Sequence, residues 1–83
     1  MKSRQEIFEH VTHLMATMFE LDKGELVESA NLYEDLDVDS IDAVDLIVEL
    51  KSYTGKKISP EDFKNVRTIG DVVTAIEDLL GHD

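Results

Sequence analysis

Apolar residues recur at steps of three and four along three separate segments of this chain, and this spacing limits the fold more than any other feature. Such spacing places them on one face of a helix. The pattern predicts helices from about Arg4 to Phe19 or Glu20, from Ser40 to about Tyr53, and from Thr68 to a stop at Gly81. A fourth, short helix is expected after Ser59, which precedes a proline and two acids.

No segment alternates apolar and polar residues as a half-buried strand would. We therefore predict an all-α four-helix bundle, with three longer helices and a short third one, in a single domain spanning residues 1–83. A chain of 83 residues is near the lower limit for a stable core and has little room for an enclosed active site.

The connection between the first two long helices, residues 21–38, is longer than most loops in compact domains. We expect a short helical turn near Lys23 to Val27. We also expect apolar side chains to hold the connection against the bundle: Leu26, Val27, Leu32, Tyr33 and Leu36.

The chain is strongly acidic, with 19 acidic and 8 basic residues and a net charge of −11. Such a charge repels nucleic acid. Between Lys23 and Lys51 there is no Lys or Arg, so we interpret this stretch as a docking surface for partners with basic patches. The chain has no Cys, no signal-peptide pattern and no apolar run of membrane-spanning length. We expect a cytoplasmic protein without membrane insertion that is monomeric when free.

Ser40 lies where a carboxylate-rich loop meets the apolar pattern of the second helix. Asp39 is a good N-cap, and Asp42 can reach back toward it. The free N–H groups and the dipole at a helix start favour an anion, such as a phosphodiester on the serine oxygen. A nucleophilic serine would need a base, and the neighbouring carboxylates make an alkoxide harder to form. We therefore predict a hydroxyl modified by another enzyme, and no catalytic residue.

The second helix has two apolar sides. One side is expected to face the core: Ala43, Leu46, Ile47, Leu50 and Tyr53. The other must be covered by another helix or left exposed, and is flanked by Asp42, Asp45 and Glu49: Ile41, Val44 and Val48. We interpret this second side as a partner-binding patch.

Two metal-binding alternatives fail on the residues. Asp35, Asp37 and Asp39 copy the first ligands of an EF-hand loop, but Ser40 occupies the place of the glycine and Leu46 that of the bidentate glutamate. His10 and His13 lie near one helix face without further ligands, so we expect them to face solvent. We predict no metal site beyond loose binding of divalent ions.

The run Asp39-Ser40-Ile41 resembles the Asp-Ser-Leu motif of acyl carrier proteins. The surrounding pattern, Leu32-x3-Leu36-x2-Asp39-Ser40-Ile41-x4-Leu46-x3-Leu50, and the later helices extend the resemblance from Ile7 to Leu80. It implies that Ser40 bears 4′-phosphopantetheine, which holds acyl groups as thioesters, and that Asp39 orients the site. It implies that the second helix is a recognition helix for a phosphopantetheinyl transferase, a ketosynthase and other acyl-processing enzymes, using Ile41, Asp42, Val44, Asp45, Val48 and Glu49.

Acyl chains would be shielded between the second helix and the later helices by Leu46, Ile47, Leu50, Val66, Ile69 and Ile76. Several residues depart from the pattern of fatty-acid carriers: Asp37 replaces a usual glycine, Ile41 a leucine, and Lys51-Ser52 lie where the helix is commonly acidic, with Lys56 and Lys57 beyond. They favour a dedicated polyketide or aryl-polyene pathway over primary fatty acid synthesis. A D-alanyl or other aminoacyl carrier and an unmodified acidic interaction module remain alternatives.

Overall fold

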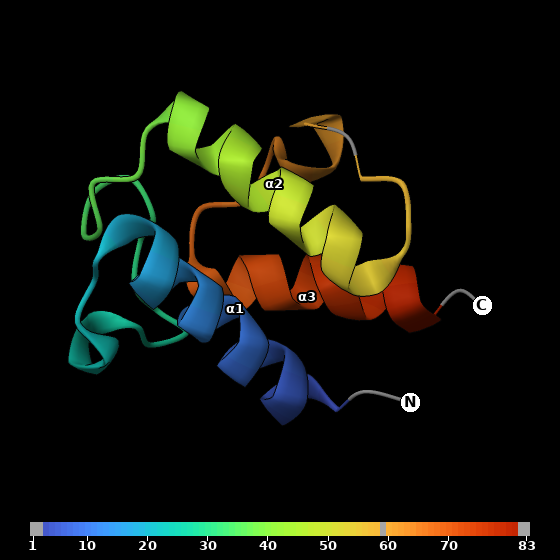
Figure 1. The fold of residues 1–83 in the computed structure, drawn as a ribbon, viewed down its shortest axis with the longest axis horizontal. Helices are drawn as coiled ribbons and strands as arrows, with labels where there is room; N and C mark the ends of the chain where they lie inside the picture. Colours follow the sequence, from blue (N-terminus) through green and yellow to red (C-terminus); the bar gives the residue numbers. More distant parts are fainter. Residues whose placement is uncertain (1–2, 59, 82–83) are drawn as a thin grey trace.

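The computed structural model describes residues 3–58 and 60–81 as an assembly of helices joined by ordered connections (Figure 1). It contains three α-helices: α1 (Arg4–Phe19), α2 (Ser40–Thr54) and α3 (Ile69–Gly81). Two single-turn 3₁₀ helices lie between them: η1 (Lys23–Glu25) and η2 (Pro60–Phe63). The described residues form no strand, only one isolated bridge between Asn31 and Thr68. The predicted all-helical class and the three long helices are confirmed.

The expected short third helix is a 3₁₀ turn, so the described part of the chain holds three α-helices and not four. The turn is closed by tight bonds, in which the Lys64 N–H donates to the Glu61 carbonyl at 3.1 Å and the Val66 N–H to that of Phe63 at 3.1 Å. Phe63 and Val66 are both buried in the apolar cluster, as their apolar character predicted. The proposed N-cap, Ser59, lies outside the described residues.

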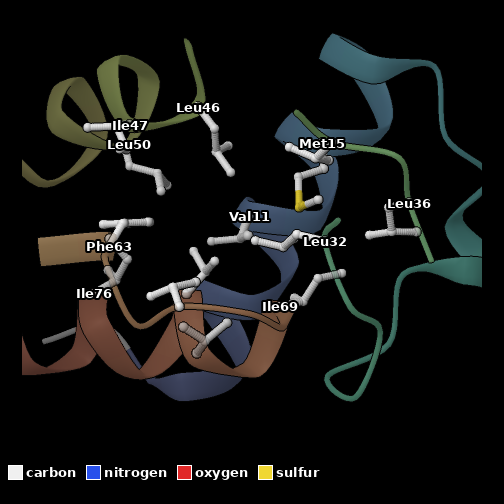
Figure 2. Packing of buried hydrophobic residues seen from close by; sticks show 14 of the residues in the cluster. Val11, Met15, Leu32, Leu36, Leu46, Ile47, Leu50, Phe63, Ile69 and Ile76 are labelled. Atoms are coloured by element: carbon white, nitrogen blue, oxygen red, sulfur yellow. The ribbon is translucent and has the colours of Figure 1, made fainter. Parts of the chain in front are cut away.

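The core forms where α2 crosses the pair made by α1 and α3 (Figure 1). Ile7, Val11 and Met15 of α1 are fully buried and belong to the same cluster as the apolar face of α3. From the opposite side α2 contributes Leu46, Ile47 and Leu50, whose side chains point into this interior (Figure 2). The core side predicted for α2 is therefore confirmed, with Ala43 and Tyr53 partly buried at its margin.

The long connection is held against the start of α3 and the turn before it. The Leu32 N–H donates to the Arg67 carbonyl at 2.8 Å, and the Gly70 N–H donates to the Glu28 carbonyl at 2.9 Å. A Cβ on Gly70 would lie 3.1 Å from that Glu28 oxygen, so this close approach favours glycine. The connection is thus fixed across the bundle, as expected, and the helical turn predicted near Lys23 is η1.

The apolar residues that anchor the connection are only partly those predicted. Leu26, Leu32 and Leu36 are buried, as are Ala30 and Val38, which the sequence pattern did not single out. Val27 and Tyr33 are wrong as anchors, since 49% and 38% of their surfaces are exposed. Each directly follows a buried leucine, Leu26 or Leu32, in a non-helical segment where successive side chains point in different directions.

Arg4 ties the start of α1 to the connection and to α3. Its guanidinium pairs with the Glu28 carboxylate at 2.5 Å and with that of Glu77, and it donates to the Thr74 hydroxyl at 3.1 Å. Hydrogen bonding to the two carboxylates raises the Arg4 pKa. Three segments that are distant in sequence therefore meet at one cation.

A capping interaction begins α3. The Thr68 hydroxyl accepts from the Asp71 N–H at 3.1 Å, and the Asp71 carboxylate accepts from the N–H groups of Thr68 at 3.2 Å and Arg67 at 3.0 Å. The bond from the Arg67 N–H is the main cause of a lowered Asp71 pKa, because it stabilises the ionised carboxylate.

The expectation that both histidines face solvent is wrong for His10. Its ring stacks on that of Tyr53, with the centroids 3.6 Å apart and the planes inclined by 13°. The contact joins α1 to the C-terminal part of α2, and His10 is partly buried there, whereas His13 is exposed. His10 therefore belongs to the packing between these helices.

Candidate functional site

Ser40 is the first residue of α2 and is exposed. The described residues give its hydroxyl no hydrogen-bond partner. The hydroxyl is thus accessible at the positive end of the helix dipole, where the first turn leaves backbone N–H groups without intrahelical acceptors. These features fit a phosphodiester on the serine oxygen.

The two flanking aspartates fix where α2 begins. The Asp39 carboxylate accepts from the Asp42 N–H at 2.8 Å, and the Asp42 carboxylate accepts from the Asp39 N–H at 3.4 Å. This reciprocal capping box confirms the prediction made from the sequence. Because Ser40 lies between the two capping residues, the box also determines where its hydroxyl is presented.

Asn31 organises the loop that leads into this helix start. Its side-chain oxygen accepts from the N–H groups of Tyr33 at 2.9 Å and Glu34 at 3.0 Å, and its own N–H donates to the Asp35 carboxylate at 2.8 Å. The Val38 N–H then donates to the Leu32 carbonyl at 2.8 Å. Asp35, one of the acids in the EF-hand-like run, therefore shapes the loop.

Asp37 adopts a left-handed backbone conformation, with φ +55°. Residues with a Cβ rarely occupy this region, and Asp and Asn tolerate it better than most. The chain can then turn between the buried residues Leu36 and Val38 and enter α2 at Asp39. A positive φ explains why a glycine is common at this position in the family that the chain resembles.

We expect Asp37→Gly to be tolerated and Asp37→Val to be destabilising. A β-branched residue in the left-handed region costs roughly 1–2 kcal/mol more than glycine, so the two variants should differ by about that amount in free energy of unfolding. Urea unfolding followed by circular dichroism measures the difference, with Asp37→Ala as an intermediate reference. Equal stability of the Gly and Val variants would contradict a strained backbone at this residue.

The outer side of α2 is an apolar patch with a carboxylate rim. Ile41, Val44 and Val48 have 73%, 47% and 57% of their surfaces exposed, so no other described element covers them. Asp45 and Glu49 are exposed on the same helix. We call these five residues the α2 docking surface. Its exposure confirms one of the two outcomes that the sequence left open.

The six residues predicted to line an acyl cavity come together in the core. Leu46, Ile47 and Leu50 point from α2 into the core (Figure 2), and all six residues are buried. The set is completed by Val66, Ile69 and Ile76. In this structure they pack against one another, and two hollows on the surface are lined by other residues.

One of these hollows lies beside the start of α2 and was not expected from the sequence. It has a volume of about 500 Å³ and is lined by the end of α1, the loop before α2 and Asp42, including Phe19, Leu21 and Asp37. Its walls come from segments that are some twenty residues apart. The only sequence signal was the apolar Leu21 just after the first helical pattern.

Among the described residues, no group of three His, Asp or Glu side chains is placed to hold a metal ion. Within the same ranges, no helix is both long and apolar enough to cross a membrane.

Comparison with known proteins places the chain in a family. Residues 9–76 match the family described as a phosphopantetheine attachment site. The chain is 47% identical to acyl carrier protein 2 of Ralstonia nicotianae over 75 residues, covering 90% of this chain and 93% of the relative. It is 38% identical to the acyl carrier protein of Thermotoga maritima over 81 residues, covering 98% and 100%.

The fold agrees with this assignment. The structure superposes on that of the acyl carrier protein from Enterococcus faecalis with a TM-score of 0.76 and 26% identity, covering 99% of this chain and all of the other. The matched family is defined by its phosphopantetheine attachment site, and the relatives carry acyl groups. The chain therefore belongs to the acyl carrier protein family, and it is a carrier that bears phosphopantetheine and not an enzyme.

Proposed function

We propose that Ser40 is the residue to which phosphopantetheine is attached. The observation that supports this most directly is an exposed hydroxyl on the first residue of a capped α-helix, with no hydrogen-bond partner in the part of the chain that the structure describes. Such a helix start offers backbone donors and a favourable dipole to the phosphate of the arm. The bound group supplies a terminal thiol that holds the acyl chain as a thioester.

The residues around Ser40 position the arm and take no part in bond making. Asp39 and Asp42 hold the helix start through their capping box. Leu36 and Val38 anchor the preceding loop in the core, so the serine is presented from a fixed backbone. In such a carrier the arm supplies the reactive thiol, and the protein provides attachment, orientation and recognition.

The test is modification by a broad-specificity phosphopantetheinyl transferase with coenzyme A. Intact-mass analysis should find one phosphopantetheine on the wild-type chain and none on Ser40→Ala. Ser52→Ala removes another exposed hydroxyl of α2 and should be modified normally. A wild-type chain that gains no mass, or an arm that persists in Ser40→Ala, would refute the assignment of Ser40.

We further propose that the α2 docking surface receives the basic faces of the transferase and of acyl-processing enzymes such as a ketosynthase. Asp42 lies in the first turn of α2, close to Ser40, and its carboxylate adds to the negative electrostatic potential of this surface. The carboxylates would steer the encounter, and Ile41, Val44 and Val48 would provide the apolar contact. The net charge of −11 supports partners of opposite sign.

We propose that acyl chains are shielded by the six core residues named above, which come from α2, from α3 and, for Val66, from the segment between η2 and α3. The core would open between α2 and the later elements, since those residues are already apolar and adjacent. Loading the chain with an octanoyl group should shift the methyl NMR signals of Leu46, Ile47 and Ile76 relative to the unacylated holo form. If instead Leu21 and Leu36 shift, the chain lies in the hollow beside α1.

The acyl substrate is proposed to come from a dedicated polyketide or aryl-polyene pathway, with primary fatty acid synthesis as the alternative. The departures at Asp37 and Ile41 and the lysines at the end of α2 support this choice. In a reconstituted fatty acid synthase, the holo chain should support slower elongation than that system's own carrier. An aminoacyl carrier would instead be loaded by a dedicated ligase with an amino acid.

A further inference from the structure

The charge of α2 reverses along its length. From residue 24 to residue 50 the chain has nine carboxylates and no Lys or Arg, whereas residues 51–57 hold three lysines and no acid. Lys51 is on α2, and Lys56 and Lys57 follow its C-cap, Gly55. A chain of net charge −11 thus places a compact basic cluster at the end of its recognition helix.

A hollow accompanies this basic cluster. It has a volume of about 430 Å³ and is lined by Val48, Lys51, Ser52, Gly55, Lys56 and Lys57. Val48 also belongs to the α2 docking surface, so the apolar patch continues directly into the hollow. At 100° per residue, Val48, Lys51 and Ser52 lie on the same outward side of α2 as Ile41 and Val44.

Two of the lysines, Lys51 and Lys57, contribute little that the fold requires. Lys51 and Lys57 are exposed, and no carboxylate among the described residues forms an ion pair with either. The helix end is closed by its own backbone, because the Gly55 N–H donates to the Lys51 carbonyl at 2.9 Å. A cation in the last turn suits the helix dipole, which accounts for Lys51 but not for Lys57, beyond the helix.

We propose that this hollow, hereafter the lysine hollow, docks a partner enzyme of the carrier pathway through an apolar side chain flanked by carboxylates. The partner face would be basic opposite Asp45 and Glu49 and acidic opposite Lys51 and Lys57. Lys51 is eleven residues beyond Ser40 on α2, about 16 Å at 1.5 Å per residue. The acidic cluster of the partner would therefore lie at a similar distance from the entrance through which the partner's active site receives the arm.

Such a bipolar surface selects partners as well as attracting them. An enzyme with a uniformly basic face would be drawn to the start of α2 and repelled by the lysine hollow at its end. An enzyme with the matching acidic cluster would be attracted at both ends and held in a single orientation. This inference rests on the proposed function, because it assumes that enzymes meet the arm on Ser40 across α2.

The test uses the holo chain with an electrophilic chloroacrylamide on its pantetheine thiol, which alkylates the active-site cysteine of a docked ketosynthase. Each ketosynthase of the source organism is purified and its crosslinking rate measured at limiting carrier concentration. For the fastest enzyme, Lys51→Glu with Lys57→Glu should slow crosslinking by about tenfold or more, since two attractions become repulsions. Lys51→Gln with Lys57→Gln should give a smaller loss.

Lys23→Glu with Lys64→Glu is the matched control, because both lysines are exposed and lie outside α2. It changes the net charge equally and should leave the rate within about twofold of wild type. Circular dichroism melting checks that both pairs are folded. In the partner, neutralising the acidic cluster should abolish the difference between wild type and the Lys51/Lys57 variant.

Unchanged crosslinking of the Lys51/Lys57 variant, or equal slowing by the control pair, would overturn the proposal. So would an NMR titration in which inorganic phosphate saturates the signals of these lysines at low millimolar concentration, because that would identify a small-anion site. Attachment of the arm to the wild-type chain by the transferase distinguishes failure of the Ser40 assignment from failure of the lysine hollow as a docking site. A chain that never acquires the arm refutes both, whereas a loaded chain indifferent to these lysines refutes only the lysine hollow as a docking site.

Discussion

Leu50→Ala is expected to lower the free energy of unfolding by about 2–5 kcal/mol, the range for truncating a fully buried leucine. Leu50 is fully buried in the interior shared by the three α-helices (Figure 2). For a domain of this size each kcal/mol lowers the melting temperature by about 4–8 °C, so thermal and urea unfolding should both detect the change readily.

Val48→Ala is the matched control on the same helix. Val48 has more than half of its surface exposed, so its truncation should change stability by no more than about 0.5 kcal/mol. The contrast tests the orientation of α2 directly. Comparable losses for the two variants would mean that both sides of the helix are buried, contrary to this structure.

Asp45→Lys combined with Glu49→Lys is expected to slow attachment of the arm by about tenfold or more at low salt. The change replaces two attractive contacts with a basic transferase face by two repulsive ones. The initial rate of pantetheine incorporation measures the effect, which should shrink at high ionic strength because salt screens exposed charges. Asp42 is left unchanged, since its carboxylate caps α2.

Glu9→Lys combined with Asp78→Lys changes the net charge by the same amount on α1 and α3, where both acids are exposed. This control pair should retain a rate within about twofold of wild type. If it slows modification as much as the α2 pair, the transferase senses total charge and the α2 docking surface has no special role. Melting curves of both pairs separate a loss of recognition from a loss of folding.

Local signals in the sequence were sufficient for the helices and for the candidate attachment residue. The Asp39–Asp42 box and the Ser3 cap, whose hydroxyl accepts from the Glu6 N–H at 3.2 Å, act within one helical turn. Their residues can therefore be recognised without knowing the rest of the fold. The same holds for Gly55, which ends α2 with φ +69°.

Predictions that depended on contacts between distant segments were less reliable. Val27 and Tyr33 were expected to anchor the connection, but Ala30 and Val38 are buried instead, because pairing with residues 67–70 sets the orientation of this segment. His10 was expected in solvent, and the crossing of α1 and α2 places it on Tyr53. Neither outcome has a local sequence signal.

The sequence by itself determined where the helices start and stop, where Ser40 is placed, and that α2 has two apolar sides, because capping and periodicity act over a few neighbouring residues. Only the tertiary structure decided which of those sides is exposed, that Arg4 joins three segments, and that the lysines after α2 border a hollow continuous with Val48. Burial and shape depend on which distant surfaces meet, and the packing of α1 and α3 against α2 settles that.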